Sequence, residues 1–80
     1  MTYQDIPTYL ILRCLAQNDG KGLDVYAINM EAMGDIADEH ALHALCRDLS
    51  RENLLSHDVF TDLYRITIWG HKWLADNRLF

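Results

Sequence analysis

The sequence predicts one small α+β domain, mainly α, that spans residues 1–80 and contains three helices, two strands and a C-terminal helix in that order. Two observations predict this class. Apolar residues recur with the 3.6-residue period of a helix up to Asn53, and with the two-residue period of a strand after it. Half of the residues are apolar, which is enough for one compact core in a chain of 80 residues.

The first two helices are predicted from their ends. The first begins at Asp5, because an acidic residue that precedes a proline in the first turn is a typical helix start, and Gly20 is expected to stop it. Asp24 is predicted to cap the second helix, which continues to about Met33. Gly34 then supplies the residue that commonly ends a helix.

The third helix is predicted to begin near Ala37 or Asp38 and to continue to Glu52. Asn53 is expected to adopt the left-handed conformation that ends the helix, because asparagine tolerates it best after glycine. Apolar side chains fall at i, i+3, i+4 and i+7 along the helix, which predicts one buried face. The residues of this face are Ala41, Leu42, Leu45, Cys46 and Leu49.

Two strands and a last helix are predicted after Asn53. Residues 54–60 form the first strand, residues 61–63 a short turn, and Thr67 is the predicted N-cap of the last helix. The second strand is predicted by apolar residues that alternate with polar ones, at Tyr64, Ile66 and Ile68. The last helix is expected to present Trp69, Trp73 and Leu74 on its apolar side.

The cysteines and the N-terminus indicate a cytoplasmic protein. Cys14 and Cys46 each lie within an apolar helical pattern, so both are expected to be buried thiols and not half of a disulfide framework. The N-terminus lacks the pattern of a signal peptide, and no apolar run approaches the roughly 20 residues of a membrane span. One core is expected to contain Leu10, Ile28, Leu42, Leu45, Leu49, Ile66 and Leu74.

Several stretches resemble a known superfamily. Residues 24–28 (DVYAI), residues 43–55 (HALCRDLSRENLL) and residues 64–74 (YRITIWGHKWL) resemble the winged helix-turn-helix superfamily, particularly small prokaryotic and phage regulators. Gly34 fits the turn that the family places between its second and third helices. The resemblance implies a winged helix-turn-helix fold whose recognition helix, over about residues 37–52, enters the major groove of DNA.

A row of cationic side chains is expected on the third helix, opposite its leucines. Arginine can bind a guanine edge or a phosphate, and a protonated histidine can donate to a phosphate. Arg65 on the second strand is expected to add a backbone contact. Together with the resemblance, which implies DNA binding, this row predicts a sequence-specific, double-stranded DNA-binding transcriptional regulator, unless the row is only the solvated face of an amphipathic helix. Its residues are His40, His43, Arg47 and Arg51.

The charge balance favours a second hypothesis. Twelve acidic residues against seven basic ones give a net charge of −5, whereas nucleic-acid binders usually carry a basic excess. The alternative function is an acidic protein-binding module of phage or mobile-element origin, such as an anti-CRISPR or host-takeover inhibitor. This module would dock on a basic nucleic-acid-binding partner. Its expected residues are Asp35, Asp38, Glu39, Asp58 and Asp62.

The first and last helices carry more apolar surface than one small core needs. This excess predicts a homodimer through these two helices, unless both simply close the core over the sheet. The residues expected at the dimer interface are Tyr9, Ile11, Trp73 and Phe80.

Neither a metal site nor an enzyme is expected. His40, His43 and Cys46 are spaced three apart, but a structural zinc needs four ligands and Cys46 belongs to the apolar face of the helix. The sequence contains no glycine-rich phosphate loop and no cysteine with an obvious histidine partner at an exposed site, so we expect no cofactor and no catalytic residue.

Overall fold

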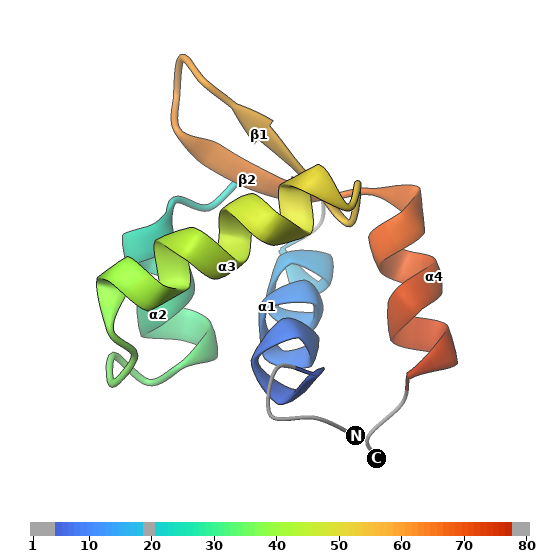
Figure 1. Cartoon of the computed structure of the whole chain (residues 1–80), viewed down its shortest axis with the longest axis horizontal. Coiled ribbons are helices and arrows are strands. Elements are labelled where there is room, and N and C mark those ends of the chain that lie inside the picture. The colour runs from blue at the N-terminus through green and yellow to red at the C-terminus, as the bar shows by residue number, and fades with distance from the viewer. Residues whose placement is uncertain (1–4, 19–20, 78–80) are drawn as a thin grey trace.

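The computed structural model describes residues 5–18 and 21–77. Within these residues the chain forms four helices and one two-stranded antiparallel sheet, an α+β fold that is mainly α, as predicted. Figure 1 shows α1 at the centre, crossed by α3 and flanked by α2 on one side and by the antiparallel α4 on the other. The elements are α1 (Asp5–Gln17), α2 (Val25–Ala32), α3 (Glu39–Arg51), β1 (Leu55–Asp58), β2 (Leu63–Ile66) and α4 (Ile68–Asp76).

Side-chain caps fix the starts of three of these helices. The carboxylate of Asp24 accepts a hydrogen bond from the amide of Ala27 at 2.8 Å, which confirms the predicted cap of α2. Asp38 caps α3 through the amide of His40 at 3.2 Å, and the helix proper begins one residue later. The hydroxyl of Thr67 caps α4, as predicted. Such caps each stabilise a helix by about 1 kcal/mol, because they satisfy amides that have no partner within the helix.

The end of α3 depends on Asn53, which has a φ of 65° as the sequence predicted. The amide of Asn53 donates to the carbonyl of Ser50 at 3.1 Å, and the amide of Leu54 donates to the carbonyl of Leu49 at 3.0 Å. This pair of bonds is a Schellman motif, which satisfies the last carbonyls of a helix and reverses the chain. The hairpin therefore starts directly beside the C-terminus of α3.

The hairpin pairs Leu55 with Ile66 and His57 with Tyr64. The predicted first strand over 54–60 is too long, because the strand ends at Asp58. The turn predicted at 61–63 is also misplaced: the chain turns over residues 59–62, and the amide of Asp62 donates to the carbonyl of Asp58 at 2.7 Å to close it.

The junction between β2 and α4 also differs from the prediction. Ile68 was expected in the strand, but it is the first residue of α4 and its side chain is 78% exposed. The cause is Thr67, whose hydroxyl donates to the carbonyl of Asn53 and accepts from the amide of Gly70. Gly70 lies so close to the preceding chain that a Cβ there would be 2.4 Å from the carbonyl oxygen of Leu54.

One hydrophobic core joins α1, α2, α3 and the hairpin. Of the residues expected in it, Ile28, Leu42 and Leu49 are buried, whereas Leu45, Ile66 and Leu74 are half-buried and pack against its edge. Leu10 is only half-buried and lines a surface hollow, so the prediction that it belongs to the core is wrong. The remaining buried residues of the core are Ile11, Leu12, Leu15, Val25, Cys46, Leu55 and Tyr64. Among the described residues, no helix has the length and apolar character to cross a membrane.

Candidate functional site

Helix α3 presents one face to the core and the opposite face to solvent. Leu42, Cys46 and Leu49 are buried, as their spacing predicted, whereas Ala41 was wrongly assigned to the buried face and is exposed. The opposite side carries the predicted cationic side chains, of which His40, Arg47 and Arg51 are exposed and His43 is half-buried. The row is therefore accessible along the helix.

The structure divides this row into two parts. His40, His43 and Arg47 line one shallow hollow of about 300 Å³, together with the small side chain of Ala44. Arg51 does not line this hollow. Its guanidinium lies 3.7 Å from the carboxylate of Asp48, in an exposed ion pair of the kind that contributes little to stability.

Arg47 is close enough to β2 for its charge to act on Tyr64. Burial raises the pKa of Tyr64 on β2, and the positive charge of Arg47 opposes that shift. His57 stacks on the same tyrosine, with ring centroids 4.3 Å apart and ring planes 17° apart. The charge of Arg47, which lines the hollow on α3, thus acts on a stacked aromatic pair that lies one register position before the hairpin turn.

Arg65 does not join the hollow on α3 either. It lies on β2 opposite Ser56, and its charge acts on Asp58. The amide of Phe60 is the largest cause that holds the pKa of the Asp58 carboxyl below its ordinary value, and Thr61 and Arg65 add to it. Arg65 is therefore partly balanced by a neighbouring carboxylate.

The five acidic residues form two groups, one in the α2–α3 segment and one at the hairpin turn, and both segments lie on the side of the molecule away from α4 (Figure 1). Asp35, Asp38 and Glu39 lie between α2 and the first turn of α3, and Asp58 and Asp62 lie at the hairpin turn. All five are exposed. Three of them also stabilise local structure. Asp38 caps α3, and the carboxylates of Asp58 and Asp62 form hydrogen bonds within the hairpin turn.

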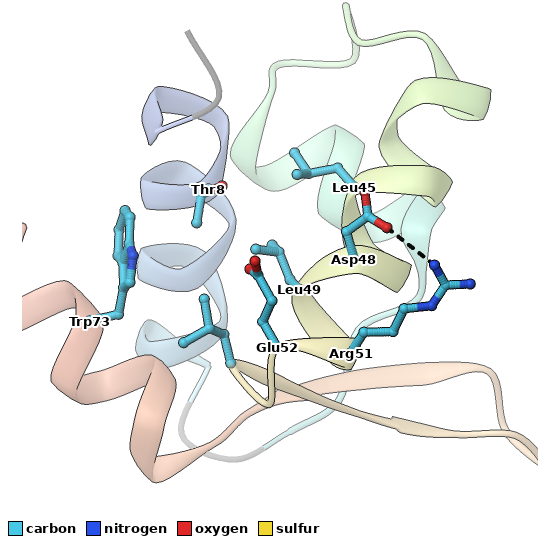
Figure 2. A pocket seen from close by; sticks show the side chains of 8 residues that line it. Thr8, Leu45, Asp48, Leu49, Arg51, Glu52 and Trp73 are labelled. Carbon is cyan, nitrogen blue, oxygen red and sulfur yellow. Dashed lines mark ion pairs between the residues drawn. The ribbon is translucent and has the colours of Figure 1, made fainter. Parts of the chain in front are cut away.

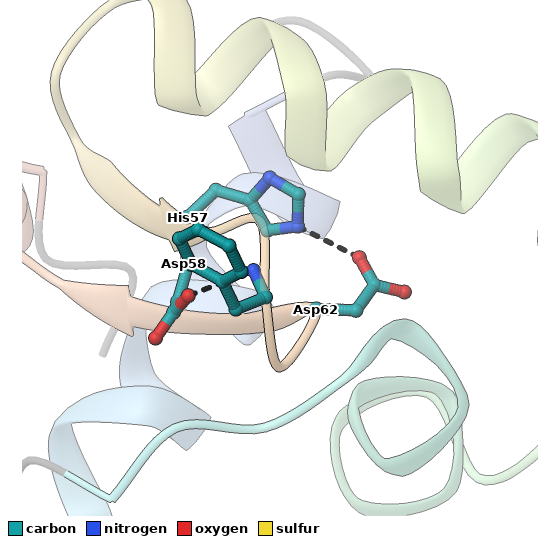
Figure 3. Close-up of polar contacts among 4 residues, drawn as sticks. His57, Asp58 and Asp62 are labelled. Carbon is teal, nitrogen blue, oxygen red and sulfur yellow. Dashed lines mark hydrogen bonds and ion pairs between the residues drawn. The ribbon is translucent and has the colours of Figure 1, made fainter.

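Two side-chain hydrogen bonds organise the hairpin turn, and its tip is apolar. Figure 3 shows His57 pointing at Asp62, with Nε2 and Oδ1 2.7 Å apart. Asp58 accepts from the amide of Phe60 at 2.9 Å. Between these contacts the side chains of Val59 and Phe60 are 75% and 95% exposed. Sequence reasoning missed this tip because it assigned both residues to a strand.

A second hollow lies where α1, α3 and α4 meet, and sequence reasoning also missed it. It measures about 440 Å³. Figure 2 shows Trp73 on one side of it, Leu45 and Asp48 on the other, and the carboxylate of Glu52 between them. Its lining residues come from separate parts of the chain, so no local pattern marks them. They are Thr8, Leu45, Asp48, Leu49, Arg51, Glu52, Leu54 and Trp73.

The structure changes the predicted dimer interface. Ile11 is wholly buried inside the domain, so its assignment to the surface was wrong. The reason is that α1 is contacted by α2, by α4 and by β2, which cover several of its sides. Tyr9 and Trp73 are half-buried and remain candidates, and Phe80 lies outside the described residues.

His40, His43 and Cys46 do not converge on a metal position. Cys46 is in the core, whereas His40 projects from the exposed side of the same helix. Burial raises the pKa of the Cys46 thiol to about 12, so the thiolate that a metal requires is disfavoured. Among residues 5–18 and 21–77, no group of three or more His, Cys, Asp and Glu side chains is placed to hold a metal ion.

No family model, no curated protein and no solved structure matches this chain.

Proposed function

We propose that this chain is a winged helix-turn-helix domain that binds double-stranded DNA sequence-specifically and acts as a transcriptional regulator. The order of elements supports the proposal, because a helix pair joined by a tight turn is followed directly by a hairpin and a last helix. In this arrangement α3 is the recognition helix, and the hairpin β1–β2 is the wing beside it.

The observation that carries the proposal is the hollow of His40, His43 and Arg47 on the exposed side of α3. A major groove is wide enough to receive one helix, and it offers acceptor atoms of guanine and phosphate oxygens to such side chains. The small side chain of Ala44 leaves room for a close approach. Arg47 is the residue that we expect to reach a base edge.

The charge distribution limits the expected affinity. Arg51 lies beside Asp48 and the charge of Arg65 acts on Asp58, so each of these cations has a neighbouring carboxylate that repels a phosphate. Each phosphate that is neutralised contributes about 0.9 to the slope of log affinity against log salt concentration. With two or three phosphate contacts, we expect a slope of roughly −2 to −3, and measurable binding at low salt only.

The test is selection of duplexes from a random library at low salt, followed by titration of the selected sequence. If Arg47 reads a base, Arg47→Ala weakens binding by about 1–3 kcal/mol on the selected sequence and relaxes preference at one position. Lys72→Ala, on α4, is the matched control because Lys72 is a cation that does not line the hollow of His40, His43 and Arg47. Failure to select any duplex would overturn the proposal.

The hairpin tip favours a second candidate function, the acidic protein-binding module. Val59 and Phe60 project between Asp58 and Asp62, an arrangement suited to an apolar notch with a basic rim on another protein. A phage or mobile-element inhibitor of a nucleic-acid-binding protein would present such a surface. If this function is correct, Phe60→Ser abolishes binding to the basic partner, whereas Arg47→Ala leaves it intact.

A homodimer is part of the proposal, because two copies of a domain that reads a short half-site bind an operator more tightly than one. Tyr9 and Trp73 are the candidate contacts that remain on α1 and α4. Light scattering at high micromolar concentration is the measurement, and a mass equal to one chain would remove the dimer without affecting DNA binding by the monomer.

A further inference from the structure

We propose that the hollow between α1, α3 and α4 binds a small organic cation, in which an ammonium group is carried on an apolar or aromatic body. The volume of about 440 Å³ lies within the range of small-molecule sites. The inference does not rest on DNA binding, because the hollow shares no lining residue with the one around Arg47.

The walls of the hollow suit the apolar body of such a ligand. Leu49 is buried, Leu45 and Leu54 are half-buried, and all three present hydrocarbon to the hollow. Trp73 packs against the core and forms the opposite wall (Figure 2). An indole ring attracts a cation through its negative face, most strongly where water is partly excluded.

The charged side chains at the rim of the hollow favour a positively charged ligand. Asp48 faces Arg51, whereas the carboxylate of Glu52 forms no ion pair or hydrogen bond with any residue in 5–18 or 21–77. Among the residues that line the hollow, two carboxylates and one guanidinium leave one formal negative charge, and Lys72 lines an adjoining hollow that shares Glu52 and Trp73. An ammonium group gains from Glu52 and from the indole together, whereas a carboxylate ligand is repelled by Glu52.

Placement of Glu52 and Trp73 depends on the fold. Glu52 is the C-cap residue of α3, where its backbone amide donates to the carbonyl of Asp48 at 3.0 Å. Trp73 lies one turn after Gly70, whose lack of a side chain lets α4 approach Leu54. The two ligand-facing groups are therefore held by separate backbone constraints, which gives a preorganised site.

The experiment uses the full chain with Trp69→Phe, which leaves Trp73 as its one tryptophan. The fluorescence of Trp73 is titrated with 2-phenylethylammonium and with the uncharged 2-phenylethanol. We expect a saturable change with the ammonium compound and at least tenfold weaker binding of the alcohol. Glu52→Gln is expected to weaken ammonium binding by about tenfold, as for loss of one charge-assisted contact.

Glu31→Gln is the matched control, because Glu31 is an exposed acid that lines a different hollow. It should leave the affinity unchanged. In the unsubstituted chain, the indole N–H resonance of Trp73 gives a second readout that does not depend on the Trp69→Phe background. The proposal is overturned if neither readout saturates, if the alcohol binds as tightly as the ammonium compound, or if Glu31→Gln and Glu52→Gln have equal effects.

Discussion

The side chain of Asn29 on α2 is joined to the backbone of Ala37 by two hydrogen bonds. Asn29 Nδ2 donates to the carbonyl of Ala37, and the amide of Ala37 donates to Asn29 Oδ1, each at 3.1 Å. Asn29 is 3% exposed, and its own carbonyl accepts from the amides of Met33 and Asp35. One buried residue therefore closes the α2–α3 turn and sets where α3 begins.

Replacement of Asn29 should destabilise the domain strongly. Asn29→Ala leaves a backbone N–H and a backbone C=O without partners in a part-buried place, so we expect a loss of about 2–4 kcal/mol in the free energy of unfolding. Asn77→Ala is the control, because the amide of Asn77 bonds the carbonyl of Trp73 only at the end of α4. Urea unfolding of both variants gives the comparison; similar losses would contradict the role assigned to Asn29.

Two glycine substitutions should differ because their surroundings differ. A Cβ at Gly70 meets the carbonyl oxygen of Leu54 at 2.4 Å and Cγ1 of Ile66 at 2.6 Å, so Gly70→Ala must shift backbone and should cost at least about 2 kcal/mol. Gly34 has a φ of 64° but open space around it, so Gly34→Ala should cost about 1 kcal/mol. Thermal unfolding of the two variants measures both losses. A larger loss for Gly34→Ala than for Gly70→Ala would refute the close approach of α4 to Leu54.

Truncation of two leucines on α3 should distinguish the centre of the core from its edge. Leu42 is 3% exposed, and Leu42→Ala should cost roughly 2–5 kcal/mol through lost burial and the cavity left behind. Leu45 is half-buried beside the hollow, so Leu45→Ala should fall below that range. Denaturant midpoints at constant m-value measure both. A larger loss at Leu45 would mean that the hollow is closed in solution.

Stability should fall in alkaline solution. Burial raises the pKa of Cys46 from 9.0 to about 12, and burial also raises the pKa values of Cys14 and Tyr64. Below pH 9 the thiol of Cys46 is protonated in both states and its contribution to stability is fully present. Between about pH 9 and pH 12 the unfolded chain releases this proton first, so the free energy of unfolding decreases.

The measurement is urea unfolding at a series of pH values above neutrality. Cys46→Ala removes one titrating group, so the decrease with rising pH should be shallower in this variant than in the parent chain. An equal pH dependence in the two proteins would show that Cys46 is not a source of the alkaline instability.

Local signals predicted the starts of α2 and α4 and the end of α3 well, but not the ends of the strands. Asp24, Thr67 and Asn53 act within three or four residues of their own position, so a short stretch of sequence contains the whole interaction. The change from helical to strand spacing after Asn53 also placed the hairpin correctly along the chain. Thr67 also has a distant partner, the carbonyl of Asn53 fourteen residues earlier, which no local pattern names.

The hairpin turn was misplaced because Val59 and Phe60 extended an apparent strand pattern. A local signal was present, since an aspartate that accepts from the amide two residues later forms an Asx turn, and Asp58 does this with Phe60. Asn29 gave a weaker signal, as a polar residue within the apolar stretch of α2. Its partner lies eight residues away, so the spacing alone could not name it.

The surface assignments depended on the tertiary structure. The side of α1 that carries Ile11 is covered, and no periodicity within one helix tells which neighbours will cover it. The predicted row on α3 was accessible as expected, but Arg51 pairs with Asp48 and does not line the hollow that contains His40 and Arg47. The hollow beside Trp73 arises only when three helices meet.

The close approach at Gly70 also constrains how this chain can diverge during evolution. In a descendant that keeps α4 at the same distance from Leu54, position 70 has room for a hydrogen atom alone, while exposed surface positions can change freely. Thr67 is bound to the same arrangement, because its hydroxyl both holds the carbonyl of Asn53 and caps the amide of Gly70. Among descendants of this chain, we therefore expect a threonine followed three residues later by a glycine, directly after a strand, to be more conserved than the exposed positions.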